Sequence, residues 1–214
     1  MSNTFYDGKL VPSDRAQNRE ATVGSHAGFP TAPIVILDLP SLSTSSTRSF
    51  ERKNRKALSN PSEATALVDA LGGVRPAVSK DAKTPTLVVL ATYSGQVILL
   101  ERLLNPKVDD RGRLNGFASP RGDGRFVYTS DSFQGGEADV VLASLVRNNV
   151  MVGKPALGFL SNPQRLNVLL SRARQKLIVA TSLRFLSDVV DGTDPDKMGG
   201  ELGFFVESVE PLCY

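Results

Sequence analysis

The 214-residue chain carries a formal net charge of +3, and 41% of its residues are hydrophobic and 22% charged. That composition fits a globular protein with a buried core, and the slightly basic balance mildly favours phosphate-bearing partners. One cysteine and one histidine exclude a disulfide framework and a zinc cluster, so we expect no metal site formed by this chain.

The first part of the chain mixes irregular stretches with one clear strand. Residues 1–32 lack periodicity and predict an irregular lead-in, whereas the apolar run from Ile34 to Leu39 predicts a strand. Residues 40–60 are rich in Ser and Thr and then in Arg and Lys, which predicts a mobile loop. That loop is either a solvated surface segment or a segment that contacts phosphates.

Strands and helices alternate along the rest of the chain. Asn60 and Pro61 mark the start of a helix that ends at Leu71 before a glycine pair. The later elements that we expect are a strand over Leu87–Ala91, a helix through Leu104, a strand at "RFVYT", a strand within 138–146, an arginine-rich helix, a strand at "KLIVATS" and a helix from Leu183. Such alternation, with continuous apolar strands, predicts one α/β domain over residues 1–214 with a mainly parallel sheet flanked by helices.

The stretch "TSDSFQGGE" lies between two of these strands. Thr129 and Ser132 follow a strand end, where hydroxyls and backbone N–H groups can face a phosphate. Gly135 allows close backbone approach, and Glu137 can accept hydrogen bonds from a ribose hydroxyl. A glycine turn with a capping glutamate, without any ligand, explains the same residues equally well.

The stretch "SNPQRLNVLLSRAR" predicts an amphipathic helix capped at Ser161 or Asn162. On that helix, Arg165 and Arg172 share one flank of the apolar stripe, and Arg174 falls on the opposite flank. Paired guanidinium groups suit phosphates or carboxylates, but exposed arginines on a surface helix give the same pattern.

Together these stretches resemble motifs V and VI of superfamily 1 helicases, in the branch of the nonsense-mediated-decay RNA helicase and senataxin. The family pattern is roughly D-S-F-Q-G-[RK]-E-x-D-V-I, then S-x-V-R-S-N, then R-R-L-N-V-A-L-T-R-A-R. Three other segments agree: "SNTFYDGKL", "LSNPSEATALVDAL" and "VLATYSGQVILLERLL", which is similar to motif IV. The resemblance covers nearly the whole chain in the right order, and it implies the RecA-like fold of the second motor lobe, a P-loop NTPase-type fold without its P-loop.

The resemblance also implies roles for individual residues. Arg172 matches the arginine finger that reaches the γ-phosphate of ATP, and Glu137 matches the glutamate that binds the ribose. Gln134, Gly135 and Arg165 belong to the same motifs and are expected on the nucleotide side.

Other matched residues are expected to contact single-stranded nucleic acid: Thr129, Ser132 and Tyr93. The chain departs from the family pattern at three places. Gly136 replaces an Arg or Lys, Tyr93 lacks a preceding proline, and Gln164 replaces an arginine. These departures leave open a loss of activity.

The chain contains no G-x-x-x-x-G-K-[ST] sequence, which is the loop that cradles the phosphates of ATP. ATP with Mg²⁺ would therefore be held mainly by a first RecA-like lobe, in cis or in trans, and the chain alone is expected to be inactive. The alternative is a stand-alone, non-catalytic module that binds nucleic acid or protein. With no apolar run of ~20 residues and no secretory signal pattern, we expect an intracellular protein, nuclear or cytoplasmic, without membrane contact.

Overall fold

The computed structural model describes residues 22–41, 52–54, 57–77, 83–105, 111–151 and 154–191. The expected segments at 1–21, 42–51 and 55–56 lie outside the described residues. The elements in chain order are β1 (Val23–Ser25), β2 (Ile34–Asp38), β3 (Arg52–Asn54), β4 (Ala57–Ser59), α3 (Pro61–Leu71), β5 (Val74–Pro76), β6 (Leu87–Ala91), α4 (Ser94–Leu103), β7 (Val127–Thr129), β8 (Ala138–Ser144), α5 (Lys154–Leu157), the 3-10 helix η1 (Gly158–Ser161), α6 (Pro163–Leu170), β9 (Ala173–Thr181) and α7 (Leu183–Asp191).

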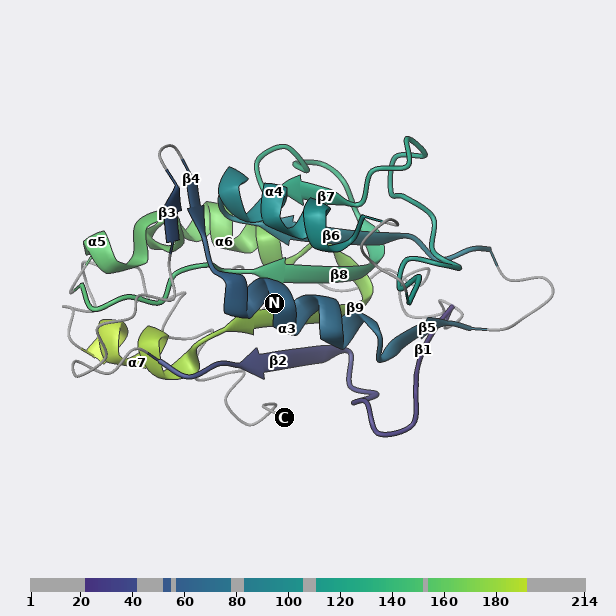
Figure 1. Cartoon of the computed structure of the whole chain (residues 1–214), viewed down its shortest axis with the longest axis horizontal. Helices are drawn as coiled ribbons and strands as arrows, with labels where there is room; N and C mark the ends of the chain where they lie inside the picture. The colour runs from purple at the N-terminus through teal and green to yellow at the C-terminus, as the bar shows by residue number, and fades with distance from the viewer. Residues whose placement is uncertain are drawn as a thin grey trace, which may run out of the picture.

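A five-stranded sheet in the order β2-β9-β8-β6-β7 organises the molecule, and all of its pairings are parallel (Figure 1). Thr129, Ala91 and Ser144 are in register across three strands, so the strand ends meet along one carboxyl edge. The predicted α/β, RecA-like architecture with a mainly parallel sheet is confirmed.

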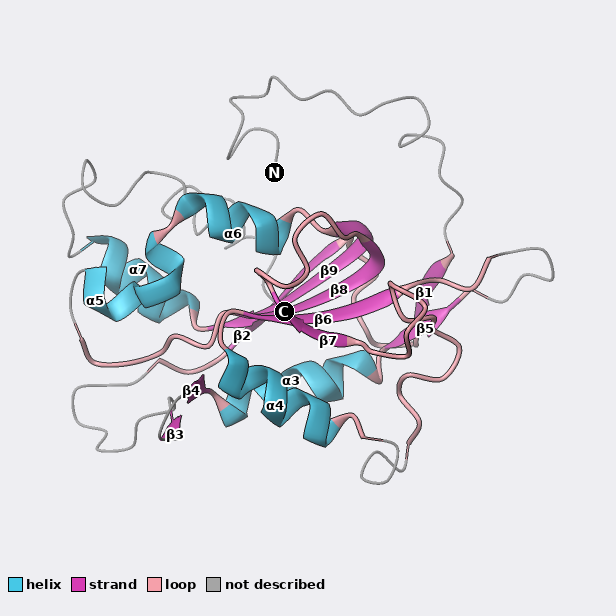
Figure 2. Cartoon of the chain, turned by 90° about the horizontal axis from the view of Figure 1, so that it is seen from above, coloured by secondary structure: helices cyan, strands magenta, loops and turns pink. Residues whose placement is uncertain are grey.

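Helices cover both faces of this sheet. In Figure 2, α3 and α4 lie on one face, and α5, α6 and α7 lie on the other. Alternate residues of the central strands enter two separate apolar clusters: Val89, Leu142 and Ile178 belong to one, and Leu90, Val141 and Val179 to the other. Because both faces are covered, the strands are apolar without alternation, as the sequence indicated.

Helix α3 has the predicted bounds, Pro61–Leu71. The Asn60 side chain caps it by accepting a hydrogen bond from the Glu63 N–H at 3.2 Å. A Ser, Thr, Asp or Asn cap of this kind stabilises a helix by about 1 kcal/mol. Glu63 lies in the first turn and is completely buried, which requires specific partners for its carboxylate.

Those partners lie at the end of β8. One carboxylate oxygen of Glu63 accepts hydrogen bonds from the Ser144 hydroxyl at 2.6 Å and from the Val146 N–H at 2.7 Å. The other accepts from the Asn60 amide at 3.2 Å, and that amide also donates to the Val146 carbonyl. Val146 has φ +70, a backbone conformation that is costly for a β-branched residue. Hydrogen bonds to both of its backbone groups hold it there.

Gln96 ties α4 into the same network. Its side chain accepts from the Asn60 N–H at 2.7 Å and donates to the Asn60 carbonyl and the Ser144 hydroxyl, each at 3.0 Å. Gln96 and Glu63 are both 0% exposed, and Ser144 is too. These residues belong to three segments of the helicase resemblance, so part of that signature is structural.

The arginine-rich helix predicted through "SRAR" is wrong in its extent. Helix α6 ends at Leu170, where the Ser171 N–H closes the last turn onto the Asn167 carbonyl. The next residues join the sheet: the Arg172 carbonyl accepts from the Ala138 N–H at 3.1 Å, and β9 starts one residue later. Pairing with β8 therefore overrides the helical periodicity, and only Arg165 of the three arginines is on the helix.

Two of the predicted irregular stretches contain short strands. Within 40–60, β3 and β4 pair antiparallel, from Arg52 opposite Ser59 to Asn54 opposite Ala57. Within 1–32, β1 pairs antiparallel with β5. Backbone hydrogen bonds form whatever the side chains are, so segments without apolar alternation can still pair when the tertiary structure brings them together.

Lys176 anchors the segment before β2 to the sheet. Its ammonium donates to the carbonyls of Pro30 at 2.6 Å and Ala32 at 2.9 Å, and it lies 5.4 Å from the ring centre of Phe29. Burial lowers the pKa of Lys176 below its ordinary value. These contacts fix the chain that leads from β1 into β2.

Replacing Glu63 by alanine should strongly destabilise the domain. The Ser144 hydroxyl and the Val146 N–H would lose a buried acceptor, and each unsatisfied buried group costs about 1–3 kcal/mol. We expect a loss of roughly 3 kcal/mol or more in the free energy of unfolding, measured by urea denaturation. Glu101→Ala removes a half-exposed carboxylate that pairs with Arg125, and should cost less than about 1 kcal/mol. Equal losses in both variants would contradict the importance of the network.

Candidate functional site

The segment between β7 and β8, residues 130–137, runs from the carboxyl edge of the sheet, where the parallel strands end, to the amino edge, where they begin. It starts beyond Thr129, which pairs with Ala91 at the carboxyl edge. It ends at Ala138, which pairs with Ala173 at the amino edge. This crossover segment carries half of the eight sequence-predicted site residues, and these four are therefore spread along one strip of surface: Ser132, Gln134, Gly135 and Glu137.

At the carboxyl edge, Thr129 and Ser132 form an exposed hydroxyl turn. The Thr129 hydroxyl donates to the Ser132 hydroxyl at 2.9 Å and accepts from the Ser132 N–H at 3.2 Å. Ser130 between them is buried, and its hydroxyl has no hydrogen-bond partner among the described residues. The structure thus brings together two of the three predicted nucleic-acid residues.

Arg121 is a residue of this edge that sequence reasoning missed. Its guanidinium donates to the Ser132 carbonyl at 2.9 Å and lies 5.1 Å and 5.4 Å from the ring centres of Tyr128 and Phe133. It is exposed, so its remaining donors face solvent. The sequence signal that could have identified Arg121 is an arginine in a glycine-rich loop. Only the fold shows that this loop turns back onto the crossover.

The loop that carries Arg121 is held by a second set of polar contacts. The Tyr128 hydroxyl donates to Asp123 at 3.0 Å, and the Arg125 guanidinium lies 4.7 Å from the Tyr128 ring centre. Burial, together with the Asp123 hydrogen bond, raises the pKa of Tyr128. The Arg125 N–H is the main cause that lowers the pKa of Asp123. The loop therefore presents Arg121 in a defined position.

Tyr93, the third predicted nucleic-acid residue, is partly buried at the start of α4. Its hydroxyl accepts a hydrogen bond from the Phe159 N–H at 3.0 Å, and the two rings pack with centres 6.2 Å apart. A side chain on Gly158 would sit 2.6 Å from that hydroxyl. Tyr93 thus connects α4 to η1 and is not grouped with Thr129 and Ser132 by any contact.

The middle of the crossover lies beside the first turn of α6. Arg165 pairs with Asp131 at 3.6 Å, and its guanidinium lies 5.1 Å from the ring centre of Phe159. Both partners of the ion pair are at least half exposed, so the pair contributes little to stability. Gln134 and Gly135 are exposed on the same segment. Gly135 has φ +78, a conformation that favours glycine.

Arg172 lies at the amino end of the strip. Its guanidinium donates to the Val168 carbonyl at 2.8 Å, to the Ser171 hydroxyl at 3.0 Å and to the Gly136 carbonyl at 3.4 Å. The Val168 bond satisfies a carbonyl of the last turn of α6, where a cation is also favourable for the helix dipole. Contacts within this domain therefore place Arg172 beside the crossover.

Glu137 is next to this arginine and pairs with Arg174, which sequence reasoning placed on the wrong element. Arg174 Nε donates to the Glu137 carboxylate at 3.0 Å, and Arg174 Nη1 lies 3.9 Å from Asp139. The register of β9 against β8 creates this pair. One corner of the molecule thus holds two guanidinium groups and the carboxylates of Glu137 and Asp139, close to the Gly136 backbone.

Gly136, where the helicase pattern has Arg or Lys, has a structural explanation. A Cβ there would lie 2.7 Å from the Phe133 ring, which is buried and packs against Tyr128 at 5.3 Å between ring centres. The missing side chain makes room for the ring beneath the crossover. The glycine that replaces the Arg or Lys of the helicase pattern is therefore the residue against which the Phe133 ring packs.

The corner formed by Glu137, Arg172 and Arg174 suits a ligand with both phosphate and hydroxyl groups. Guanidinium groups bind phosphate oxygens with directed hydrogen bonds, and a carboxylate accepts from sugar hydroxyls. Within the described part of the chain, no three His, Cys, Asp or Glu side chains are grouped to hold a metal ion. No helix in that part is long and apolar enough to cross a membrane.

Comparison with known proteins identifies the family. A family described as AAA domain matches residues 1–184. The chain belongs to this AAA domain family. Its similarity to superfamily 1 helicases of the nonsense-mediated-decay and senataxin branch is confirmed by the relatives that it matches.

Three relatives match most of this chain. The Arabidopsis thaliana DNA replication ATP-dependent helicase/nuclease JHS1 is 26% identical over 88% of this chain and 13% of its own length. The Caenorhabditis elegans regulator of nonsense transcripts 1 is 28% identical over 87% of this chain and 16% of its own. The Homo sapiens probable helicase senataxin is 25% identical over 84% of this chain and 6% of its own. The chain therefore spans only a small part of the length of these relatives.

Gly136→Ala should displace the Phe133 ring. The added Cβ would approach that buried ring to 2.7–2.9 Å, and such overpacking costs about 1–3 kcal/mol. We expect changed NMR signals of the Phe133 and Tyr128 rings together with lower stability. Gly135→Ala is the matched control, because its Cβ would meet nothing within 4 Å, although its positive φ also carries a cost. Unchanged ring signals in Gly136→Ala would overturn this account.

Proposed function

We propose that this domain is the second motor lobe of an ATP-dependent RNA or DNA helicase or translocase. The observation that carries the proposal is the corner at the amino edge, where Arg172 and Glu137 flank the Gly136 peptide. The helicase names of its relatives support the same conclusion. A first RecA-like lobe would bind on this side and complete the nucleotide site.

In this proposal Arg172 acts as the arginine finger. ATP with Mg²⁺, held mainly by the first lobe, would supply the transferred phosphoryl group. The longest of the Arg172 hydrogen bonds, 3.4 Å to the Gly136 carbonyl, is the one that we propose gives way to a γ-phosphate oxygen. The bonds to Val168 and Ser171 keep the guanidinium in place, and a pre-positioned cation stabilises the charge that develops during phosphoryl transfer.

Glu137 would bind the ribose, and its pairing with Arg174 orients the carboxylate for that purpose. Arg165, Gln134 and Gly135 line the neighbouring surface of the crossover, where Arg165 is partly neutralised by Asp131. These residues would contact the nucleotide or the first lobe. The ion pairs Arg165–Asp131 and Arg174–Glu137 are exposed, so their rearrangement when the two lobes close would cost little free energy.

The nucleic-acid track would run along the carboxyl edge. Thr129 and Ser132 offer hydroxyls and a backbone N–H, and Arg121 adds a guanidinium beside the Ser132 carbonyl. Such groups bind phosphates without reading sequence. Tyr93 would contribute to the same edge through its ring, because its hydroxyl is occupied by Phe159.

A non-catalytic module is the second candidate, and one observation favours it. Gly136 stands where the helicase pattern has an arginine or lysine, so a cation of that pattern is missing beside the Arg172 guanidinium. In that case nucleic-acid binding at the carboxyl edge would remain without ATP turnover.

Arg172→Ala tests the motor proposal in a protein that contains both lobes. We expect nucleic-acid-stimulated ATP hydrolysis to fall by about 10³-fold or more, with affinity for single strands retained. Arg184→Ala, an exposed arginine of α7 paired with Asp188, should keep the full rate. The present chain alone should release no phosphate above background. An unchanged rate in Arg172→Ala would refute the finger assignment.

Arg121→Ala tests the nucleic-acid track. Fluorescence anisotropy with labelled RNA and DNA single strands should show weaker binding, and the slope of log affinity against log salt should fall by about 0.7, the value for one phosphate contact. Arg125→Ala is the control, because Arg125 stacks on the same Tyr128 ring but pairs with Glu101. Equal effects of the two substitutions would assign the loss to loop packing and contradict a direct phosphate contact.

A further inference from the structure

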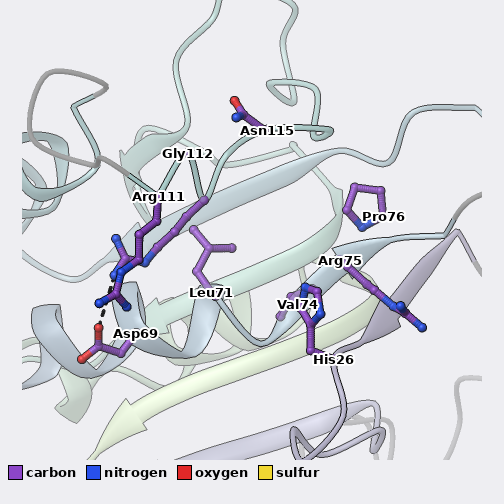
Figure 3. Close-up of a pocket in the computed structure, with 11 residues that line it drawn as sticks. His26, Asp69, Leu71, Val74, Arg75, Pro76, Arg111, Gly112 and Asn115 are labelled. Carbon is purple, nitrogen blue, oxygen red and sulfur yellow. Dashed lines mark hydrogen bonds and ion pairs between the residues drawn. The ribbon is translucent and has the colours of Figure 1, made fainter.

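A cavity of about 470 Å³ opens on the opposite face of the sheet from α6 (Figure 3). It lies where α3 ends, between β5, the turn after β1 and the segment 111–115. The residues that line it are His26, Asp69, Leu71, Gly72, Val74, Arg75, Pro76, Arg111, Gly112, Arg113 and Asn115. Its size is within the range of small-molecule sites. None of these residues belongs to the site proposed above.

The lining is rich in hydrogen-bond donors and poor in acceptors. Three arginines and one histidine line the cavity, together with a single carboxylate, Asp69. The Arg113–Asp69 pair is long, at 3.5 Å, with the Arg113 side chain 11% exposed and the Asp69 side chain 63% exposed, so Asp69 offsets one of the three arginine charges. Arg111 is exposed and has no hydrogen bond or ion pair with another described residue. The cavity therefore carries an excess of positive charge among its described side chains.

A tight turn sets the positions of Arg111 and Arg113. Gly112 between them has φ +57, and the Asn115 N–H closes the turn onto the Gly112 carbonyl at 2.8 Å. A Cβ on Gly112 would lie 2.3 Å from the Asn115 amide nitrogen, so this turn requires glycine. Figure 3 shows Arg111 and Asp69 at one side of the cavity and Arg75 extending away on the other side, and its dashed line marks the ion pair between Arg113 and Asp69.

The opposite wall is also fixed. The His26 N–H donates to the Gly73 carbonyl at 2.8 Å, and the chain that follows is anchored by Lys176 through Pro30 and Ala32. The His26 imidazole rises into the cavity between Arg111 and Arg75 (Figure 3). Donors from three separate segments therefore surround one space.

We propose that this cavity binds the phosphate group of a small organic phosphate, with Arg111 and Arg113 as its principal ligands. Guanidinium groups hold phosphate oxygens with paired, charge-assisted hydrogen bonds, and a bound anion would relieve the repulsion between neighbouring cations. His26 and the Asn115 amide supply further donors. The site is separate from Arg172 and Glu137, and it does not depend on the motor function.

NMR titration of the present chain with inorganic phosphate, and then with adenosine monophosphate, tests the proposal. The backbone amide signals of Gly112 and Asn115 should shift and saturate. Arg111→Ala should raise the dissociation constant at least tenfold, and the exposed position of Arg111 makes misfolding no concern. Arg184→Ala removes the same charge from α7 and should leave the constant unchanged.

The proposal is overturned if the amide signals do not move, if sodium chloride at equal ionic strength moves them equally, or if Arg111→Ala binds as tightly as Arg184→Ala. An unphosphorylated oligonucleotide distinguishes the source of the phosphate. Arg111-dependent shifts with it would overturn a small organic phosphate as the ligand and assign a backbone phosphodiester instead, whereas shifts only with adenosine monophosphate support the proposal. Arg172→Ala should bind phosphate normally, which separates this test from that of the motor.

Discussion

The buried carboxylate of Glu63 is the interaction on which the arrangement of this domain depends. A charged group without solvent is tolerated only when hydrogen bonds replace its hydration. Here the partners come from the start of α3, from the end of β8 and from the chain beyond it, and Gln96 adds the start of α4. One network thus fixes two helices against the central strand at the carboxyl edge, and it holds Val146 in a conformation that a β-branched residue otherwise avoids.

A rigid carboxyl edge has consequences for the surface around it. Since β6, β7 and β8 are held in register, the crossover 130–137 must span the sheet from one edge to the other, beside α6. Its apolar side is fixed by Phe133 beneath Gly136, whereas its polar side makes exposed ion pairs with Arg165 and Arg174. The buried packing of Phe133 therefore holds the segment in place, while the ion pairs on its exposed side are weak. This combination suits a surface that must exchange partners without loss of the fold.

The two candidate ligand sites use the same chemistry in different ways. At the crossover, each arginine already has an acceptor within the domain, so a ligand must compete with existing hydrogen bonds and ion pairs. In the cavity below α3, Arg111 has none among the described residues, and the one carboxylate is weakly paired. A ligand at the crossover corner must therefore displace existing partners, whereas an anion in the cavity can bind Arg111 without doing so.

The sequence by itself determined the order along the chain of the five strands of the main sheet and of the helices α3, α4, α6 and α7, together with the bounds of α3 and the parallel sheet, because apolar runs, caps and glycines act locally. It also placed Thr129 and Ser132 after a strand and Glu137 before the next. Only the tertiary structure decided where α6 ends: pairing of β9 with β8 moves Arg172 off the helix and brings Arg174 to Glu137. The same holds for the β3–β4 pair and for Arg121, whose loop folds back onto Phe133. These features rest on contacts between residues far apart in the chain, and local periodicity carries no information about such contacts.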